Sequence, residues 1–484
     1  MKRKFLAFVL LITAGLSLSS CLSSDDDTNI EYSHDTAITA FSLGNLGQYV
    51  KRNTTGKMDS LVASAVTGTN YTFTIDQANR KIYNEDSLPA LTRTAAALAT
   101  ISAKNSSYIQ LIYDKNVVKE GEDKDSIVWY SSSDSINFDQ LNKEKNIRVY
   151  AQDASAYADY LLTVNVHKEF PDSFVWHSLA HGNAALNSLV GAEKTLVLGN
   201  GTVCVLGKNA EDKTVVLTSA DGKNWETAST LSSSASQSVA TLDGKLFVIE
   251  DGKVMTSADA KTWNMVAENQ SLTQLLGASS KYLYARSDDA IYASADGETW
   301  TKQAMDNATD CLPITNISLN AINIASVKNA ESLLLVGTRD AAYGDTIAVA
   351  WTGTADYSLP IGDNKWNYIE YDKNQAGKLP YLAQLAVTTS SEGLVALGSN
   401  GKWYRSLNGG IKWTVDTLMT LPTGFDASKP FSLVRATEKL TAADGTQYDG
   451  HFYWLINAGN AWRGRFNKEA WGSNKTKPFL GIIV

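Results

Sequence analysis

The sequence predicts an all-β protein in which a small β-sandwich precedes a β-propeller. The chain has 484 residues, too many for one ordinary hydrophobic core. Short segments between residues 37 and 168 alternate apolar and polar side chains, as half-buried strands do. Beyond residue 170 a turn-like motif ending in tryptophan recurs. Trp225, Trp263 and Trp300 are 38 and 37 residues apart, a spacing typical of propellers and solenoids.

Residues 1–21 carry the features of a secretory signal in the expected order. Positively charged "MKRK" precedes the apolar run "FLAFVLLITAGLSL", which is too short to span a bilayer comfortably. Leu18-Ser19-Ser20-Cys21 then resembles a bacterial lipobox. The resemblance implies a lipoprotein that begins at Cys21 once the signal is removed, with acyl chains on this cysteine that anchor it to the membrane.

Residues 22–36 are expected to form an acidic, flexible tether. Asp25, Asp26 and Asp27 are consecutive, and their mutual repulsion keeps the segment extended and solvated. The segment also resembles the short acidic export signal of Bacteroidota surface lipoproteins, which implies an outer-membrane protein exposed on the cell surface. The net charge of -8 argues against nucleic acid as a partner, because nucleic-acid binding needs clustered Lys and Arg.

Residues 37–168 are predicted to form an antiparallel β-sandwich. The strand-like segments are "AITAFSLG", "YTFTID", "ATISAKN", "YIQLIY", "SIVWYS", "NIRVYAQD" and "YLLTVNVHK". The ending "DASAYADYLLTVNV" resembles the last strands of bacterial immunoglobulin-like surface modules. The Cys…Trp…Cys spacing of antibody domains is absent, so the resemblance concerns architecture. In the mature chain, Cys204 and Cys311 either form a disulfide or remain separate thiols, and the sequence leaves this open.

Residues 170–484 contain the repeated motif Ser-x-Asp-Gly-x-x-Trp, which resembles the Asp-box of sialidase-like propellers. In that family the box is the hairpin between the third and fourth strands of a blade. Ser and Asp side chains accept hydrogen bonds from backbone N–H groups, glycine relieves a positive φ, and tryptophan covers the apolar face. The matching residues are Ser219, Asp221, Gly222 and Trp225; Ser257, Asp259 and Trp263, with Ala260 in place of glycine; Ser294, Asp296, Gly297 and Trp300; and Ser406, Asn408, Gly410 and Trp413.

Two further units complete a count of six, with seven blades as the alternative. One is a degenerate unit around Trp366, and the other is "HFYWLINAGNAWRGRFNKEAW" near the C-terminus. The long interval between Trp300 and Trp366 predicts an insertion, which we place as a loop at residues 310–320. The early strand at 174–179 is expected to pair with the last blade and close the ring, which removes free sheet edges.

The sequence does not support a sialidase. That family needs an arginine triad, and its members usually carry an Arg-Ile-Pro stretch early in the propeller. No Arg-Ile-Pro stretch occurs in this sequence. The arginines between residues 170 and 484 are Arg286, Arg339, Arg405, Arg435, Arg463 and Arg465. A hydrolase with paired carboxylates stays open, because its two groups can come from distant blades.

His177 and His181 on one strand are too far apart to share a metal ion, and no cofactor motif is present, so we predict no metal and no cofactor.

The whole pattern resembles an uncharacterised family of Bacteroidota surface lipoproteins. We expect a non-catalytic binding or scaffold protein that captures a glycan or protein ligand on the propeller face. Residues considered for that face are Trp351, Trp403, Trp454, Arg463 and Arg465, although the two arginines also fit a structural role in the last blade. The alternatives are a divergent glycoside hydrolase or lyase that uses the central funnel, and an accessory subunit of an outer-membrane nutrient uptake complex. The sequence does not predict the oligomeric state.

Overall fold

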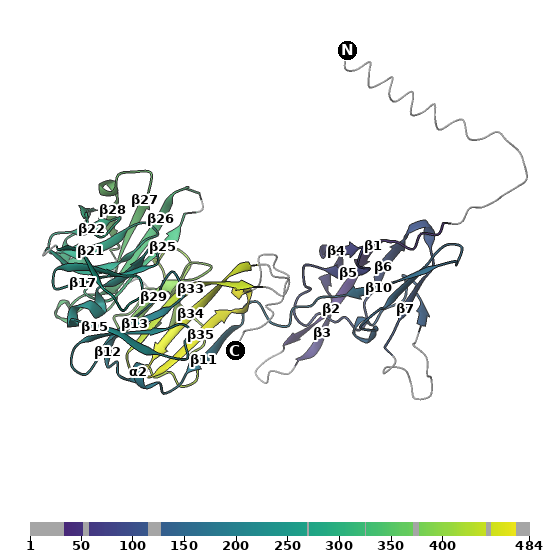
Figure 1. Cartoon of the computed structure of the whole chain (residues 1–484), viewed down its shortest axis with the longest axis horizontal. Coiled ribbons are helices and arrows are strands. Elements are labelled where there is room, and N and C mark those ends of the chain that lie inside the picture. Colours follow the sequence, from purple (N-terminus) through teal and green to yellow (C-terminus); the bar gives the residue numbers. More distant parts are fainter. Residues whose placement is uncertain are drawn as a thin grey trace, which may run out of the picture. The chain divides into compact units, whose positions relative to one another are not determined.

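A computed structural model describes residues 33–51, 58–114, 127–268, 271–324, 326–370, 377–441 and 447–470 (Figure 1). The predicted signal peptide, Cys21 and the tether up to residue 32 lie outside the described residues. Contacts divide the chain into two compact units. The first ends at Asn165 and leaves out Glu85–Leu91, which joins Val166 and the following residues in the second. Among the described residues no helix is long and apolar enough to cross a membrane.

The described residues of the first unit form ten strands, and each of the seven predicted segments overlaps one of them. The strands are β1(Ile38–Leu43), β2(Asn45–Lys51), β3(Met58–Thr67), β4(Phe73–Asp76), β5(Lys81–Asn84), β6(Ala99–Ala103), β7(Ile109–Ile112), β8(Ile127–Trp129), β9(Ile147–Tyr150) and β10(Tyr157–Thr163). The sequence pattern did not predict β2, β3 and β5. Strand β5 has only four residues, too few for alternation to stand out.

The strands of the first unit pair into one large sheet and two strand pairs. The large sheet has the order β4-β5-β10-β9-β7-β8, and the pairs are β1-β6 and β2-β3. The expected antiparallel arrangement was wrong at one place, because β10 pairs with β5 in parallel. Tyr160 on β10 is fully buried, and its hydroxyl accepts a hydrogen bond from the backbone N–H of Ile38 at 3.3 Å. The last strand of the sheet is thereby tied to β1.

The described residues of the second unit form six sheets, each with at least four strands (Figure 1). The first three are β12(Gly191–Val197)-β13(Val203–Lys208)-β14(Thr214–Ser219)-β15(Glu226–Leu231), β16(Val239–Leu242)-β17(Lys245–Glu250)-β18(Lys253–Ser257)-β19(Asn264–Glu268) and β20(Leu272–Ala278)-β21(Leu283–Ser287)-β22(Ile291–Ser294)-β23(Thr301–Lys302). The last three are β25(Thr315–Asn323)-β26(Ala330–Thr338)-β27(Val349–Asp356)-β28(Lys365–Tyr368)-β24(Ala304–Met305), β29(Leu385–Thr389)-β30(Leu394–Gly398)-β31(Trp403–Ser406)-β32(Thr414–Asp416) and β33(Phe431–Thr441)-β34(Gln447–Asn457)-β35(Asn460–Phe466)-β11(Phe174–Ala180).

The six sheets are arranged in a closed ring. The first strand of each meander lies beside the first strand of the next, in the cyclic order β12, β16, β20, β25, β29, β33 and back to β12. Side chains also link these inner strands: the Ser318 hydroxyl accepts from Val387 N–H at 3.1 Å, and the Thr388 hydroxyl accepts from Arg435 N–H at 3.1 Å. Backbone groups of an inner strand thus find partners on the neighbouring sheet, as buried polar groups require.

A hydrophobic cluster fills the space between each pair of neighbouring sheets. Six such clusters join the sheets around the ring, the last of them joining the sixth sheet to the first. Each contains at least one tryptophan: Trp225, Trp263, Trp300, Trp366 and Trp413 in successive clusters, and Trp403 with Trp462 in the cluster between the fifth and sixth sheets. The core of the second unit is therefore a ring of interfaces.

The N-terminal strand of the second unit completes the sixth sheet, as the sequence predicted. Strand β11 pairs antiparallel with β35, and the register runs from Phe174 opposite Phe466 to Ala180 opposite Ala461 (Figure 1). Trp176 on β11 packs against Trp403 of the fifth sheet, with ring centroids 6.3 Å apart, and its indole N–H donates to the Thr420 carbonyl at 2.6 Å.

The four Asp-boxes form the turns between the third and fourth strands of the first, second, third and fifth sheets. In the third sheet, one oxygen of Asp296 accepts hydrogen bonds from the N–H groups of Glu298 and Thr299 at 2.8 and 2.9 Å. Gly297 has a φ of 80°, and the Trp300 indole N–H donates to its carbonyl at 2.9 Å. Asn408 replaces the aspartate in the fifth sheet and still accepts from a backbone N–H at 2.9 Å.

The segment between Trp300 and Trp366 contributes five strands to the fourth sheet, and the short β24 is the additional one. The loop predicted at 310–320 was wrong, because residues from Thr315 onward form the inner strand β25. The remaining length holds β24 and the turns around β26 and β27. The described short helices are α2(Ala184–Asn187) and the 3-10 helices η1(Gly68–Asn70), η2(Lys104–Ser106), η4(Phe138–Gln140), η5(Ser233–Gln237), η6(Thr309–Cys311), η7(Ala341–Tyr343), η8(Ile361–Asp363) and η9(Asn467–Ala470).

Replacing the aspartate of one Asp-box should destabilise the propeller. Asp296→Ala removes an acceptor for two backbone N–H groups and should lower the free energy of unfolding by about 1–2 kcal/mol. Asp296→Asn should lower the free energy of unfolding by less, because Asn408 accepts the equivalent hydrogen bond in the fifth sheet. Urea unfolding measures the loss in both variants, and Glu298→Ala, at an exposed position two residues further on, is the control. Equal losses in the alanine variant and the control would contradict the role of the box.

The contribution of the first Asp-box should depend on pH. Hydrogen bonds from the Asn224 and Lys223 N–H groups lower the pKa of Asp221 from 3.8 to about 2. A lowered pKa means that the folded state favours the carboxylate, so its stabilisation is complete above about pH 5 and is lost as pH falls toward about 2. The stability difference between wild type and Asp221→Asn, measured by urea unfolding across this range, should shrink at low pH. A constant difference would contradict the assignment.

Ring closure should be sensitive to the size of residue 464. A Cβ on Gly464 would lie 2.5 Å from Cε3 of Trp176 and 2.7 Å from Cε1 of Phe174. We therefore expect Gly464→Ala to lower the free energy of unfolding by about 1–3 kcal/mol through overpacking against β11. A Cβ on Gly191, in β12, meets nothing within 4 Å, so Gly191→Ala is the matched control. Similar melting temperatures for the two variants would argue against a tightly packed closure.

Candidate functional site

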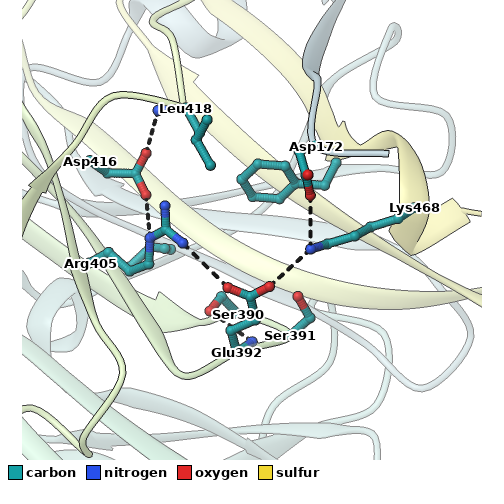
Figure 2. A pocket seen from close by; sticks show the side chains of 10 residues that line it. Asp172, Ser390, Ser391, Glu392, Arg405, Asp416, Leu418 and Lys468 are labelled. Carbon is teal, nitrogen blue, oxygen red and sulfur yellow. Dashed lines mark hydrogen bonds and ion pairs between the residues drawn. The ribbon is translucent and has the colours of Figure 1, made fainter. Parts of the chain in front are cut away.

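A polar cleft lies between the fifth and sixth sheets of the propeller, where ring closure brings distant segments together (Figure 2). Its volume is about 260 Å³. The turn after β29 contributes one wall, β31 and β32 a second, and the segments that flank β11 and β35 a third. The lining residues are Asp172, Ser390, Ser391, Glu392, Val395, Arg405, Asp416, Leu418, Phe466 and Lys468.

Charged groups of alternating sign run along the cleft (Figure 2). Arg405 donates from Nε to Asp416 at 2.7 Å and from Nη1 to Glu392 at 3.3 Å. Lys468 donates to the other oxygen of Glu392 at 2.9 Å and to Asp172 at 3.2 Å. Three carboxylates and two cations are thus joined in one chain of ion pairs, with Glu392 in the middle. Phe466 and Leu418 supply apolar surface beside them.

The electrostatics of the cleft favour binding over acid catalysis. The hydrogen bond from Lys468 lowers the pKa of Glu392, and the same contact raises the pKa of Lys468. Both groups therefore stay charged at neutral pH. A glycosidase needs one carboxylic acid whose pKa is raised, so that it can protonate the leaving group. Glu392 is shifted in the opposite direction, and it is suited to accept hydrogen bonds from a ligand.

A carboxyl group with a raised pKa lies nearby but does not line the cleft. Burial raises the pKa of Glu469, whose side chain is only 2% exposed. Nη2 of Arg435 lies 3.6 Å from its carboxylate, and this cation and the contact with Ser391 offset the effect of burial only in part. Tyr453 packs beside them, and burial raises the pKa of its hydroxyl as well. A substrate cannot reach this acid from solvent without a rearrangement of the cleft.

The tryptophans considered for a ligand face are instead part of the core. Trp351, Trp403 and Trp454 are at most 5% exposed. Each lies on an interior strand of its sheet and points into a cluster between neighbouring sheets. Alternation of apolar and polar residues along a strand does not show which face of the sheet is covered. In a propeller, both faces of a sheet pack against neighbouring sheets.

The two arginines considered with those tryptophans are also engaged within the protein. Arg465 is 1% exposed and donates to both oxygens of Glu169. Arg463 pairs with Glu438 at 2.8 Å and lies over the ring of Phe452 at 4.6 Å. These contacts support a structural role for both arginines.

The cleft residues were missed in the sequence because they come from four separate segments. Asp172, Glu392, Arg405 and Lys468 share no motif, and only the pairing of β11 with β35 brings the first and last together. Arg405 was noted only as one of the arginines in the region. A single sequence offers no signal for such a site.

Other candidate features of the sequence give no site in the described residues. His177 lies on β11, and no group of His, Cys, Asp or Glu in the described residues could hold a metal ion. Cys204 is buried and Cys311 partly exposed, and the two are free thiols. A second hollow, of about 470 Å³, lies at the first Asp-box and includes Asp221 and Asp259, but both are engaged in their own turns.

Several solved structures are similar to this chain at low sequence identity. One is a Bacteroides thetaiotaomicron protein of unknown function, with 12% identity and a TM-score of 0.39 over 76% of this chain and 93% of that chain. Another is the lectin SapL1 in complex with alpha methyl fucoside, with 13% identity and a TM-score of 0.34 over 57% and 97%. A third is the GH93 alpha-L-arabinofuranosidase of Fusarium graminearum, with 12% identity and a TM-score of 0.32 over 61% and 97%.

Family models cover both units of the chain. The sequence has no match among curated proteins. Residues 170–474 match the DUF6242 beta propeller domain, and residues 41–164 match the N-terminal domain of the same family, which is described as a domain of unknown function. The strand pairing of the second unit agrees with the first of these matches. The chain therefore belongs to the DUF6242 family, in which a β-propeller forms the C-terminal domain.

Proposed function

We propose that this protein is a non-catalytic binding lipoprotein of the bacterial cell surface whose propeller captures a glycan. The lipobox with Cys21 and the acidic tether support anchoring to the outer membrane. The first unit, as an immunoglobulin-like module, serves as a spacer. The closed cycle of six inner strands supports a six-bladed propeller, in which each sheet is one blade.

The observation that carries the proposal is the chain of ion pairs in the cleft between the fifth and sixth sheets. Glu392, Arg405 and Lys468 remain charged and partly exposed, with side-chain exposures of 47, 26 and 34%. Their partners hold them in fixed positions, so a ligand meets preorganised donors and acceptors. Sugar hydroxyls both donate and accept hydrogen bonds, and charged partners make such bonds stronger. Phe466 and Leu418 offer apolar contact to the C–H face of a sugar ring.

The same observation weighs against hydrolysis at this cleft. Its central carboxyl group has a lowered pKa, and the acid with a raised pKa, Glu469, is buried. We therefore expect a captured glycan to be released without cleavage. A glycan array screened with the purified protein identifies the ligand, and mass spectrometry of that ligand before and after incubation tests for cleavage.

Removing the central carboxylate of the cleft should weaken glycan binding. Glu392→Ala deletes the acceptor shared by Arg405 and Lys468, and we expect affinity for the glycan found on the array to fall by about tenfold or more in calorimetry. Asp289→Ala is the matched control, because Asp289 is also an exposed carboxylate held by one lysine, with Lys302 at 2.7 Å, but lies in the third sheet. A blank array would contradict glycan capture, and equal affinities of the two variants would contradict its placement in the cleft.

A further inference from the structure

The outward face of the large sheet in the first unit carries a row of aromatic rings. We call this surface the aromatic face, and it consists of Tyr108, Trp129, Tyr150 and Tyr157. Exposed fractions are 61% for Tyr108, 61% for Trp129 and 57% for Tyr157. Folded proteins seldom gather so many exposed rings without a binding purpose.

Strand register places these rings on one side of the sheet. Tyr157 on β10 lies directly opposite Tyr150 on β9, and Trp129 on β8 lies opposite Gln110 on β7. Paired residues point to the same face, and Tyr108 precedes Gln110 by two positions. The ring centroids of neighbouring members are 6.3, 6.2 and 5.9 Å apart along the sequence Tyr108, Trp129, Tyr150, Tyr157.

The rings are held in place by polar neighbours on the same face. The Tyr150 hydroxyl donates to the Gln110 side chain at 3.0 Å. The guanidinium of Arg148 lies 4.1 Å from the centroid of the Tyr157 ring and donates to both oxygens of Asp159, at 2.7 and 2.9 Å. A row of fixed rings beside fixed donors and acceptors loses little conformational entropy when a ligand binds.

The charges on this face select among ligand classes. Arg148 is neutralised by its bidentate contact with Asp159, so a phosphate backbone would have to break that pair before it could bind. The centre of a protein–protein interface is usually depleted of Asp and Glu, yet here Asp159 lies on the same face as the rings, opposite Arg148 in the register. A ligand with flat apolar surfaces and many hydroxyl groups fits both features.

We propose that the aromatic face binds a neutral glycan chain, whose sugar rings stack on the aromatic rings while their hydroxyls bond to Gln110 and Asp159. Tyr108 and Trp129 also border a hollow of about 560 Å³ that includes Ser102 and Ser107. This hollow extends the surface for a chain longer than a single sugar. The inference stands apart from the propeller cleft, because every residue in it belongs to the first unit.

Affinity gel electrophoresis of the purified full chain tests the proposal. The probes are soluble neutral polysaccharides, namely a β-glucan, a xylan, a galactomannan and a starch-type α-glucan, with heparin as the anionic comparison. We expect the wild-type chain to be retarded by at least one neutral polymer. Trp129→Ala and Tyr157→Ala should each weaken that binding about tenfold, whereas Trp129→Phe, which keeps a ring, should retain most of it.

The matched control is Tyr343→Ala in the propeller. Tyr343 is 51% exposed and lies under Arg339 at 4.3 Å, as Tyr157 lies under Arg148. The control should bind like the wild type, and circular dichroism should show unchanged melting for every variant. Retardation by heparin alone, by no polymer, or equally for wild type and Trp129→Ala would overturn the proposal. Glu392→Ala separates the two sites, because a polymer whose retardation falls in Glu392→Ala but not in Trp129→Ala is bound in the propeller cleft.

Discussion

The propeller depends on one constraint: each sheet has two apolar faces, and neither can be buried within the sheet itself. Burial of apolar surface is the main source of folding free energy, so every sheet needs a neighbour on both sides. Six clusters, each with at least one tryptophan, meet this need between successive sheets. The requirement is satisfied for all sheets together only when the ring is closed. Pairing of β11 with β35 provides that closure.

Closure also creates the cleft. It carries Asp172 and Lys468, from opposite ends of the propeller sequence, to the side of Glu392 in the fifth sheet. The ion pairs at this place therefore serve two purposes, since they join the closing sheet to its neighbour and leave charged groups at the surface. The aromatic face arises differently. It follows from the register of four adjacent strands within one sheet, and no distant segment takes part.

This difference explains what could be predicted from the sequence. The Asp-boxes are local, and their serine, aspartate and glycine have fixed tasks within one turn, so Ser294, Asp296 and Gly297 were assigned with the correct contacts. The closing strand was predictable because a propeller without free sheet edges needs its last sheet to lie beside its first. The cleft was not, because its residues meet only through pairing across the whole unit. Trp351 and Trp403 were wrongly considered for a surface, since a strand pattern cannot say that both faces of a sheet are covered. The parallel β5–β10 pair was missed because alternation is the same for both strand directions.

The pairing of β11 with β35 has a consequence for the order of folding. It joins Phe174, in the first strand of the propeller, to Phe466, in the last strand of its sixth sheet to be made. Sheets one to five can form progressively from local hairpins, which close quickly. The sixth sheet is incomplete until the end of the chain arrives, and the loop to be closed then spans nearly the whole propeller, a step opposed by chain entropy. On our proposal that the chain is exported, its N-terminus crosses the membrane first, so the strand that completes the ring would arrive last and the ring would close only on the far side.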